Sequence, residues 1–331
     1  MKRKESLKKI RVKCIIKRIE RNRVIYKMLD VCLLGTGGTM PLKNRWLTSL
    51  YCRLNGSALL IDCGEGTQIA IKETDFTFKP IDILCITHFH ADHISGLPGL
   101  LLSMGNEGRT EPLTIIGPKG VHFVVNSLRV IAQELPFEIK FIELSQNEEK
   151  IKINDYNITA FRVKHTTITY GYTIEVERLG KFDADAAKAL GIPVRLWNPL
   201  QKGNTVCDGE NVFEPSMVMG PARRGIKVTY CTDTRPLDII CKQAADCDLF
   251  ICEGMYGEED KSDTAREKGH MTMIEAASIA AQAKPVPSEL WLTHYSPSLY
   301  NPEEYKKAVT LIFDNTHVCK DGKSTVLRFR D

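Results

Sequence analysis

Three histidines and one aspartate fall within six positions of the stretch HFHADHI, and no other part of the chain concentrates metal-binding groups in this way. His88 and His90 are two residues apart, so directly after a strand both side chains can point the same way. Asp92 and His93 follow at once and can be aimed at a second, neighbouring position. Imidazole and carboxylate groups suit zinc, with manganese and iron as alternatives.

A metal ion needs three or four protein ligands, so this cluster needs partners from elsewhere in the chain. Polar residues recur where predicted strands end, and His165 can complete a first metal, His294 a second, while Asp233 can bridge both. The predicted ligands are His88, His90, Asp92, His93, His165, Asp233 and His294. Two metals about 3.5–4 Å apart can lower the pKa of a bridging water to about 7 and clamp a phosphoryl group.

Each distant partner also has an ordinary structural explanation. His165 and His294, taken singly, could be core or surface histidines, and Asp233 could cap a helix that starts near PLDII. Their joint occurrence at strand ends favours the metal site, because loops at strand ends on a rigid scaffold are where sites are usually built.

From residue 29 onwards, short apolar runs alternate with amphipathic segments, which is typical of an α/β protein. The predicted strands are 29–35, 49–54, 58–62, 81–87, 113–117, 139–144, 156–163, 170–177, 227–233, 247–254, 289–294 and 324–329. The predicted helices are 64–73, 94–105, 120–135, 182–193, 273–283 and 302–313. Most connections are short, and the exception is the long insertion 177–225.

The composition of the 331-residue chain indicates a reducing environment. Its eleven cysteines form no CxxC pair, and several lie in apolar runs, so we expect free thiols and a cytoplasmic location. No run of 18 apolar residues occurs, and we therefore expect no membrane span.

The formal net charge of +4 is spread unevenly. Residues 1–28 contain twelve Lys and Arg and two Glu, a balance of +10, which leaves −6 for the other 303 residues. The body is therefore not a globally basic nucleic-acid binder, and contacts with a polyanion must use local patches. For residues 1–28 two explanations stay open, a basic arm that touches a polyanion or a poorly ordered extension.

The motif H-x-H-x-D-H, which stands here as His88, His90, Asp92 and His93, resembles that of the metallo-β-lactamase superfamily. Within it, the chain is similar to the ribonuclease Z family of tRNA 3′-processing endonucleases. The similar blocks, in order over about residues 29–300, are GTGGTMPLKNR, DCGEGTQ, THFHADHISGLPGLL, YCTDTRP, GHMT and LTHYS. The resemblance implies a four-layer αββα sandwich over residues 29–331, two zinc ions per subunit (manganese or iron being possible) and a homodimer.

In this family the long insertion is a flexible arm that grips tRNA, and residues 177–225 stand where that arm would be. Its tip departs from the usual Gly-Pro-rich sequence, since Val194 and Arg195 follow Pro193. The residues that could meet RNA phosphates are Lys43 and Arg45 in PLKNR, and Arg195, Lys202, Arg223 and Arg224 in the insertion. The segment YSPSL after His294 also departs from the family and lacks an expected arginine.

The resemblance also implies catalytic roles. His270 in GHMT matches a histidine that serves as proton donor, and Glu253 matches a glutamate that orients it. Loss of a ribose O3′ demands a general acid, because the alkoxide is strongly basic. Asp92 would bind the second metal and take the proton of the attacking water. His270 could otherwise simply begin a helix.

Three functions remain open. The first is removal of 3′ trailers from precursor tRNA after the discriminator base, leaving a tRNA 3′-hydroxyl and a 5′-phosphorylated trailer. The second is hydrolysis of a small ester, lactone or phosphodiester on the same fold, although such enzymes lack the insertion and the PLKNR block. The third is an RNA-binding protein that has lost catalysis, against which the complete ligand set argues.

Overall fold

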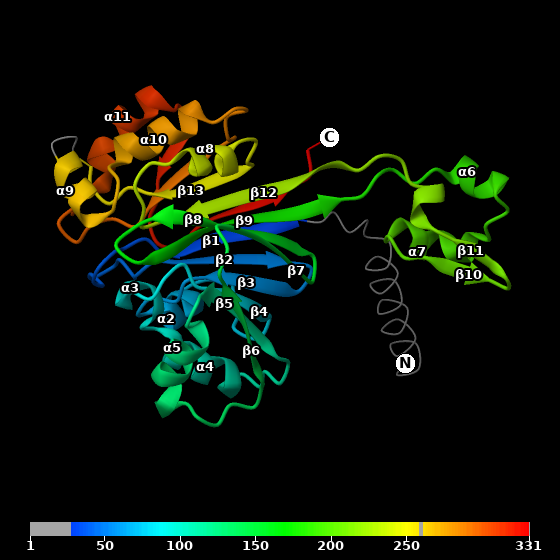
Figure 1. Ribbon diagram of the computed structural model, residues 1–331, viewed down its shortest axis with the longest axis horizontal. Helices are drawn as coiled ribbons and strands as arrows, with labels where there is room; N and C mark the ends of the chain where they lie inside the picture. Colours follow the sequence, from blue (N-terminus) through cyan, green and yellow to red (C-terminus); the bar gives the residue numbers. More distant parts are fainter. Residues whose placement is uncertain (1–27, 258–260, 331) are drawn as a thin grey trace, which may run out of the picture.

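Two seven-stranded sheets pack face to face, and helices cover both outer faces (Figure 1). This computed structural model describes residues 28–257 and 261–330, so the predictions for the basic segment lie outside the described residues, apart from Met28. The four layers confirm the predicted αββα sandwich. Within the described residues, no helix is both long and apolar enough to cross a lipid bilayer.

The first sheet has the strand order β16-β1-β2-β3-β4-β5-β6. Antiparallel pairing joins β16, β1, β2 and β3, and parallel pairing joins β3, β4, β5 and β6. The strands are β1 (Met28–Gly35), β2 (Ser49–Leu54), β3 (Ser57–Ile61), β4 (Ile81–Cys85), β5 (Leu113–Pro118), β6 (Ile139–Leu144) and β16 (Lys323–Arg328).

The second sheet repeats this plan, with the strand order β15-β14-β13-β12-β9-β8-β7. Strands β7, β8, β9 and β12 pair antiparallel, and β12 to β15 pair parallel. The strands are β7 (Glu148–Ile153), β8 (Tyr156–Lys164), β9 (Ile168–Arg178), β12 (Arg223–Cys231), β13 (Leu249–Glu253), β14 (Leu290–Thr293) and β15 (Thr316–Val318).

Helices connect the parallel strands, as the crossover geometry of such strands requires. Those on the first sheet are α2 (Thr67–Lys72), α3 (Ala91–Ile94), α4 (Leu97–Asn106), α5 (Val121–Leu128) and the 3₁₀ turn η1 (Arg129–Ile131). Those on the second are α8 (Asp238–Ala244), α9 (Ser262–Lys268), α10 (Met273–Gln282), η5 (Pro302–Tyr305) and α11 (Lys306–Ile312).

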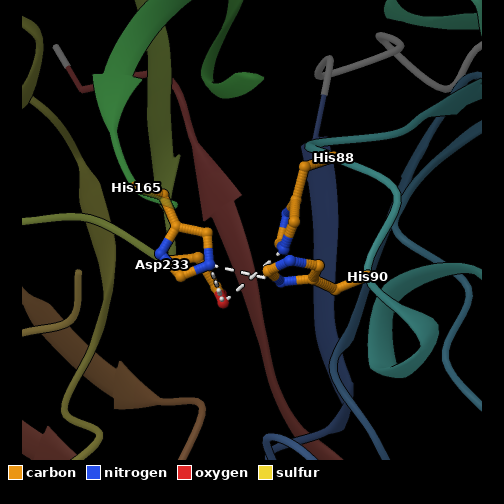
Figure 2. Close-up of side chains that lie close together, drawn as sticks. All are labelled: His88, His90, His165 and Asp233. Carbon is orange, nitrogen blue, oxygen red and sulfur yellow. Dashed lines mark hydrogen bonds and ion pairs between the residues drawn. The ribbon is translucent and has the colours of Figure 1, made fainter. Parts of the chain in front are cut away.

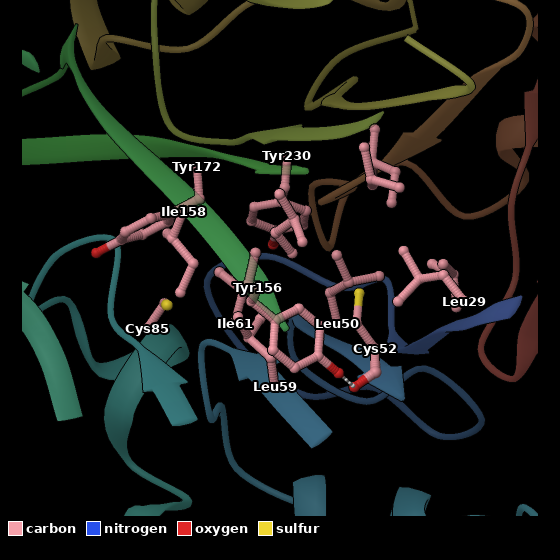
Figure 3. Close-up of a cluster of buried hydrophobic side chains, with 14 of the residues drawn as sticks. Leu29, Leu50, Cys52, Leu59, Ile61, Cys85, Tyr156, Ile158, Tyr172 and Tyr230 are labelled. Carbon is pink, nitrogen blue, oxygen red and sulfur yellow. Dashed lines mark hydrogen bonds between the residues drawn. The ribbon is translucent and has the colours of Figure 1, made fainter. Parts of the chain in front are cut away.

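Three apolar cores separate the four layers, and β1 shows how one strand serves two of them. Leu29, Val31 and Leu33 point into the core between the sheets, part of which Figure 3 shows. Cys32 and Leu34, on the opposite face, pack with the helices of the first sheet. Both faces are therefore buried, which explains why the strand reads as a continuous apolar run rather than an alternating one.

The carboxyl ends of the parallel strands meet at one edge of the sandwich. Strands β12, β13 and β14 are parallel neighbours, so their ends coincide. The first sheet joins them there, because the Tyr170 N–H donates to the Thr87 carbonyl at 3.1 Å and the Tyr172 hydroxyl to the Ile86 carbonyl at 2.7 Å. Residues that follow β4 thus face residues that follow β12 and β14.

Sequence patterns missed some elements, among them β7, α8 and α9, and overextended others. Strand β7 reads EEKIKI, in which charged residues alternate with half-buried isoleucines, and this pattern is weak. The helix expected over 120–135 ends as α5 at Leu128, because a 3₁₀ turn and then Pro136 follow.

The segment between β9 and β12 projects away from the sandwich (Figure 1). Its elements are α6 (Ala184–Ala189), η2 (Val194–Leu196), α7 (Trp197–Gln201), β10 (Val206–Asp208), β11 (Asn211–Phe213) and η3 (Pro215–Met217). We call it the extension. Ala187, Ile192, Leu200 and Val218 form a small core of its own.

Two chain segments pass closely at the neck of the extension. The Gly220 N–H donates to the Lys181 carbonyl at 2.8 Å. A Cβ on Gly180 would lie 1.9 Å from the Gly220 carbonyl oxygen, whereas a Cβ on Gly220 would meet nothing closer than 3.5 Å. Only Gly180 therefore needs to lack a side chain for this crossing.

We expect Gly180→Ala to loosen the neck, because the two backbones must separate to admit the methyl group. Overpacking of this kind costs about 1–3 kcal/mol, so the neck amides should exchange with deuterium roughly 5- to 100-fold faster. Gly220→Ala is the matched control and should leave exchange unchanged. Equal exchange rates in the two variants would contradict the inference that only Gly180 must lack a side chain at the neck.

Candidate metal centre

The cluster after β4 presents its ligands in two directions. The chain runs from the end of β4 past His88 to His90, whose backbone is extended and which is the N-cap of the short helix α3. Asp92 and His93 lie in the first turn of that helix and are buried. The change from extended chain to helix explains how six consecutive residues can serve two neighbouring positions.

The first group of ligands consists of His88, His90, His165 and Asp233, whose ligand atoms lie within 4.8 Å of one another. Asp233 Oδ2 is 3.7 Å from His88 Nε2 and 3.6 Å from His165 Nε2. His165 Nε2 is 3.3 Å from His90 Nδ1. Figure 2 shows the four side chains converging from both halves of the chain.

The second group consists of Asp92, His93 and His294, and it faces the other oxygen of Asp233. Asp233 Oδ1 is 3.2 Å from His93 Nε2 and 3.1 Å from His294 Nε2. Asp92 Oδ2 is 3.3 Å from His294 Nε2 and 3.5 Å from His93 Nε2. All seven residues proposed from the sequence therefore lie together, with Asp233 between the two groups.

The spacing fits a pair of divalent cations. Four ligands at about 2.0–2.1 Å from a tetrahedral zinc lie about 3.3 Å from each other, and the separations here run from 3.1 Å to 3.7 Å. Among the described residues, the buried His88 Nε2 has no hydrogen-bond partner. A buried imidazole nitrogen left unpaired is costly, and a cation in the first group would satisfy it.

Hydrogen bonds set the tautomers of three ligand histidines. His93 donates from Nδ1 to Asp62 Oδ2 at 2.8 Å, and His165 donates from Nδ1 to the Gly269 carbonyl at 3.0 Å. His88 Nδ1 lies 3.0 Å from the Thr87 hydroxyl, which itself donates to Asp62. In each ring these bonds engage Nδ1 and leave Nε2 as the nitrogen that faces the site, which is the arrangement that a metal ligand requires.

Sequence reasoning assigned no role to Asp62, although it follows a buried strand directly, as the predicted ligands do. Asp62 is completely buried, and its Oδ1 accepts the Thr87 N–H at 2.8 Å. Burial raises the pKa of Asp62, and His93 and Thr87 oppose this shift. The signal was present in the block DCGEGTQ, where an acid terminates the run ALLI.

A glycine-rich loop closes over the second group. The Thr39 N–H donates to Asp92 Oδ2 at 2.7 Å, and this bond orients the carboxylate. A Cβ on Gly38 would lie 2.7–2.9 Å from the ring of His294, so a larger residue would displace that ligand. The loop therefore helps to determine the position of the second group.

The carboxylate of Asp233, which lies between the two groups, is held ionised by its neighbours despite its burial. Burial alone would raise the pKa of Asp233, but the imidazoles of His294 and His93 lower it well below its usual value. Both oxygens thus carry charge to share between two cations. The alternative role as a helix cap fails, because Leu237 is the N-cap of α8.

His270 and Glu253 form a hydrogen-bonded pair beside the candidate ligands. His270 donates from Nδ1 to Glu253 Oε2 at 3.0 Å and lies 3.9 Å from Asp233 Oδ2. Glu253 is fully buried, and its Oε1 accepts the Thr234 N–H at 2.6 Å. Burial alone lowers the pKa of His270, but Glu253 outweighs it and raises the pKa to about 9. His270 does not cap α10, whose N-cap is Thr272.

The basic residues expected at RNA occupy varied settings. Arg45 donates to the carbonyls of Leu299 at 2.9 Å and Tyr300 at 3.1 Å, so its guanidinium braces the loop after His294. Arg195 pairs with Asp208 inside the extension. The side chains of Lys43 and Lys202 are exposed.

At the base of the extension, Arg223 and Arg224 have hydrogen-bond or ion-pair partners within the chain. Arg223 donates to the Leu179 carbonyl at 3.1 Å, and Arg224 pairs with Asp246 and Asp248. These contacts hold the base of the extension against the sandwich.

The fold and the two ligand groups define a metal-dependent hydrolase of the metallo-β-lactamase fold. The structure of human tRNase Z, short form, aligns with a TM-score of 0.63 at 23% identity, covering 89% of this chain and 98% of that chain. The metallo-beta-lactamase fold protein YhfI from Bacillus subtilis aligns with a TM-score of 0.65 at 19% identity, covering 91% and 99%. These likenesses establish the fold.

Sequence comparison identifies the family. Ribonuclease Z from Agathobacter rectalis is 62% identical over 302 residues, covering 91% of this chain and 99% of the relative. Ribonuclease Z from Lachnoclostridium phytofermentans is 61% identical with the same coverage. Residues 29–190 also match the family model described as Anti-Pycsar protein Apyc1. The chain belongs to the ribonuclease Z family, and the resemblance inferred from the sequence is confirmed.

We expect Asp62→Asn to weaken metal binding about 10- to 100-fold, because loss of such a carboxylate partner lowers the basicity and order of the ligand His93. Titration of the metal-free protein with Zn²⁺ measures this directly. Asp30→Asn, which removes a carboxylate paired with Arg53 on β2, is the control and should bind zinc normally. Unchanged zinc affinity in the Asp62 variant would contradict the role given to this bond.

Proposed function

We propose that the chain is a metal-dependent endoribonuclease that removes 3′ trailers from precursor tRNA. It cleaves after the discriminator base and leaves a tRNA 3′-hydroxyl and a 5′-phosphorylated trailer. Membership of the ribonuclease Z family supports the choice of substrate. The seven candidate ligands beside His270 support the proposed chemistry.

The ligand set supports two Zn²⁺ ions per subunit, and Mn²⁺ or Fe²⁺ would accept the same imidazole and carboxylate groups. His88, His90 and His165 would hold one ion, Asp92, His93 and His294 the other, and Asp233 would bridge them. When bound, such a pair activates a water molecule and neutralises charge on the phosphate.

Two side chains handle protons in this proposal. Asp92, whose Oδ2 lies beside His93 and His294 in the second group, accepts the proton of the attacking water. His270, oriented by Glu253, donates a proton to the departing ribose O3′. A histidine whose pKa is raised to about 9 is protonated at neutral pH, as a general acid must be.

The extension would bind the tRNA body at a distance from the cleaved bond. His165 lies before the start of β9, and the extension begins after its last residue, Arg178. Eleven residues of extended strand span about 33 Å, so the two regions lie at opposite ends of β9. In the extension, Arg195 and Lys202 are candidate contacts for RNA phosphates. In the PLKNR segment, Lys43 and Arg45 are further candidates.

A homodimer is supported by an apolar face on α4, α5 and η1. Its exposed side chains are Leu102, Phe123, Val130 and Ile131, with exposed fractions of 39%, 75%, 58% and 75%. These three elements contact one another, and exposed apolar side chains gathered on neighbouring elements are typical of association surfaces. A cytoplasmic location is supported by the ten described cysteines, which are all free.

The decisive experiment is cleavage of a trailer-bearing precursor tRNA with the ends of both products mapped. Purified protein with Zn²⁺ or Mn²⁺ should cut after the discriminator base, and chelation should abolish cleavage. A protein that holds two metals but does not cut would contradict the proposal. Much faster turnover of bis(p-nitrophenyl) phosphate than of precursor tRNA would favour the small-ester hydrolase. An Asp92→Ala variant with an unchanged biological effect would favour a non-catalytic RNA-binding role.

We expect Glu253→Gln to slow precursor cleavage about 10- to 100-fold at pH 8, because burial then lowers the pKa of His270 and only the weaker effect of Asp233 opposes it. In the wild type the acid form persists up to about pH 9, so activity should fall only above that pH. In the variant the fall should begin at lower pH. Glu289→Gln, which changes a Glu–His pair remote from the metals, should keep the wild-type profile, as Glu289 contacts His317. A variant profile identical to the wild type would refute this role of Glu253.

A further inference from the structure

Arg235 joins three segments that build the site. It lies two residues after Asp233, and its side chain is only 13% exposed. Its backbone N–H donates to the Lys164 carbonyl at 3.0 Å, at the end of β8. Its guanidinium donates to the backbone carbonyl of His270 and makes a two-pronged contact with the carboxylate of Glu275.

The carboxylate of Glu275 also organises the start of α10. Glu275 Oε2 accepts the Thr272 N–H at 2.9 Å, while the Thr272 hydroxyl accepts the Glu275 N–H at 3.2 Å. This reciprocal cap fixes the first turn of the helix. Arg235 is therefore hydrogen-bonded both to the backbone of His270 and to the first turn of the helix that begins three residues later.

The contacts of Arg235 are separate from those of the imidazole ring. The ring of His270 bonds to Glu253, and its backbone N–H donates to the Ala265 carbonyl at 2.8 Å. Arg235 bonds only to the carbonyl oxygen of that residue. It can therefore influence the proton donor through the position of the main chain.

We propose that Arg235 is a positioning residue that fixes the backbone of His270 relative to Asp233, and thereby the proton donor relative to the reacting phosphate. The inference rests on the proposed endonuclease function. A misplacement of about 1 Å can cost about 100-fold in rate, because proton transfer in the transition state needs tight geometry. A bidentate Arg–carboxylate contact is suited to this task, since its two parallel hydrogen bonds define an orientation.

The chemistry of the leaving group distinguishes this role from a general structural one. A ribose O3′ leaves as a strongly basic alkoxide unless it is protonated. The p-nitrophenolate of bis(p-nitrophenyl) phosphate is a far weaker base and leaves without a proton. Both substrates need the metals and the activated water, but only RNA needs a well-placed His270.

The test compares Arg235→Met with the wild type on both substrates. We expect kcat for precursor tRNA to fall about 10- to 100-fold with KM within about threefold, while turnover of bis(p-nitrophenyl) phosphate stays within about threefold. Arg235→Lys keeps a donor for the carbonyl and should recover part of the loss. Glu275→Gln should lower precursor cleavage in the same direction, because it weakens the anchor of the guanidinium.

A double-variant cycle shows whether the effect passes through His270. In a His270→Ala background, Arg235→Met should cause no further loss of precursor cleavage, because the group that it positions is absent. Arg53→Met is the matched control, since Arg53 forms a comparable two-pronged contact with Asp30 on the first sheet. It should leave both activities unchanged.

Two outcomes would overturn the inference: equal losses on both substrates in Arg235→Met protein of normal metal content, or additive losses in the double variant. If Arg235→Met protein does not fold, Arg235→Lys and Glu275→Gln are tested instead. Their losses on the two substrates, and the additivity of those losses with His270→Ala, are then judged in the same way. A wild-type protein that hydrolyses the nitrophenyl ester but never cleaves precursor tRNA would instead overturn the proposed function.

Discussion

Asp233 is the carboxylate on which the site depends, because each of its two oxygens faces a different ligand group. Oδ2 lies beside His88 and His165, and Oδ1 lies beside His93 and His294. A buried carboxylate is tolerated only when its charge is compensated, and here imidazoles provide the compensation. Two cations would complete the neutralisation, so folding of this edge and metal binding should be coupled.

The αββα architecture makes that arrangement possible. Three ligand histidines and Asp92 follow a strand of the first sheet, whereas Asp233 and His294 follow strands of the second. Hydrogen bonds between the sheets at Thr87 and Ile86 hold the two edges in register. Metals held between them would add a further link, and a ligand that binds only the folded state stabilises it.

The proposed tRNA-binding extension and the candidate metal centre lie at opposite ends of one long strand. His165 precedes β9 and the extension follows it, so a single rigid element relates the metals to the surface that would grip the tRNA body. The extension has its own small core and a close crossing at its neck. The extension can therefore vary in sequence without disturbing the packing around the candidate metal centre.

Local sequence patterns predicted much of this organisation, because burial on both faces leaves a continuous apolar run and a ligand stands out at its end. The run IDILCIT and the cluster after it, for example, located β4 and four of the ligands. Edges were less predictable. In β7 one face is exposed, so charged residues alternate with isoleucines, and such a polar segment is easily taken for a loop.

The sequence by itself determined the kinds of chemistry available, since residue types and strand ends pointed to seven candidate ligands, and the family resemblance added His270 and Glu253. The tertiary structure alone decided which oxygen of Asp233 faces which histidines, and that Asp62 bonds to His93 and Arg235 to the His270 carbonyl. It also showed that Arg45 braces a loop of its own chain. Such pairings join residues up to hundreds of positions apart, and local patterns do not encode the distances between them.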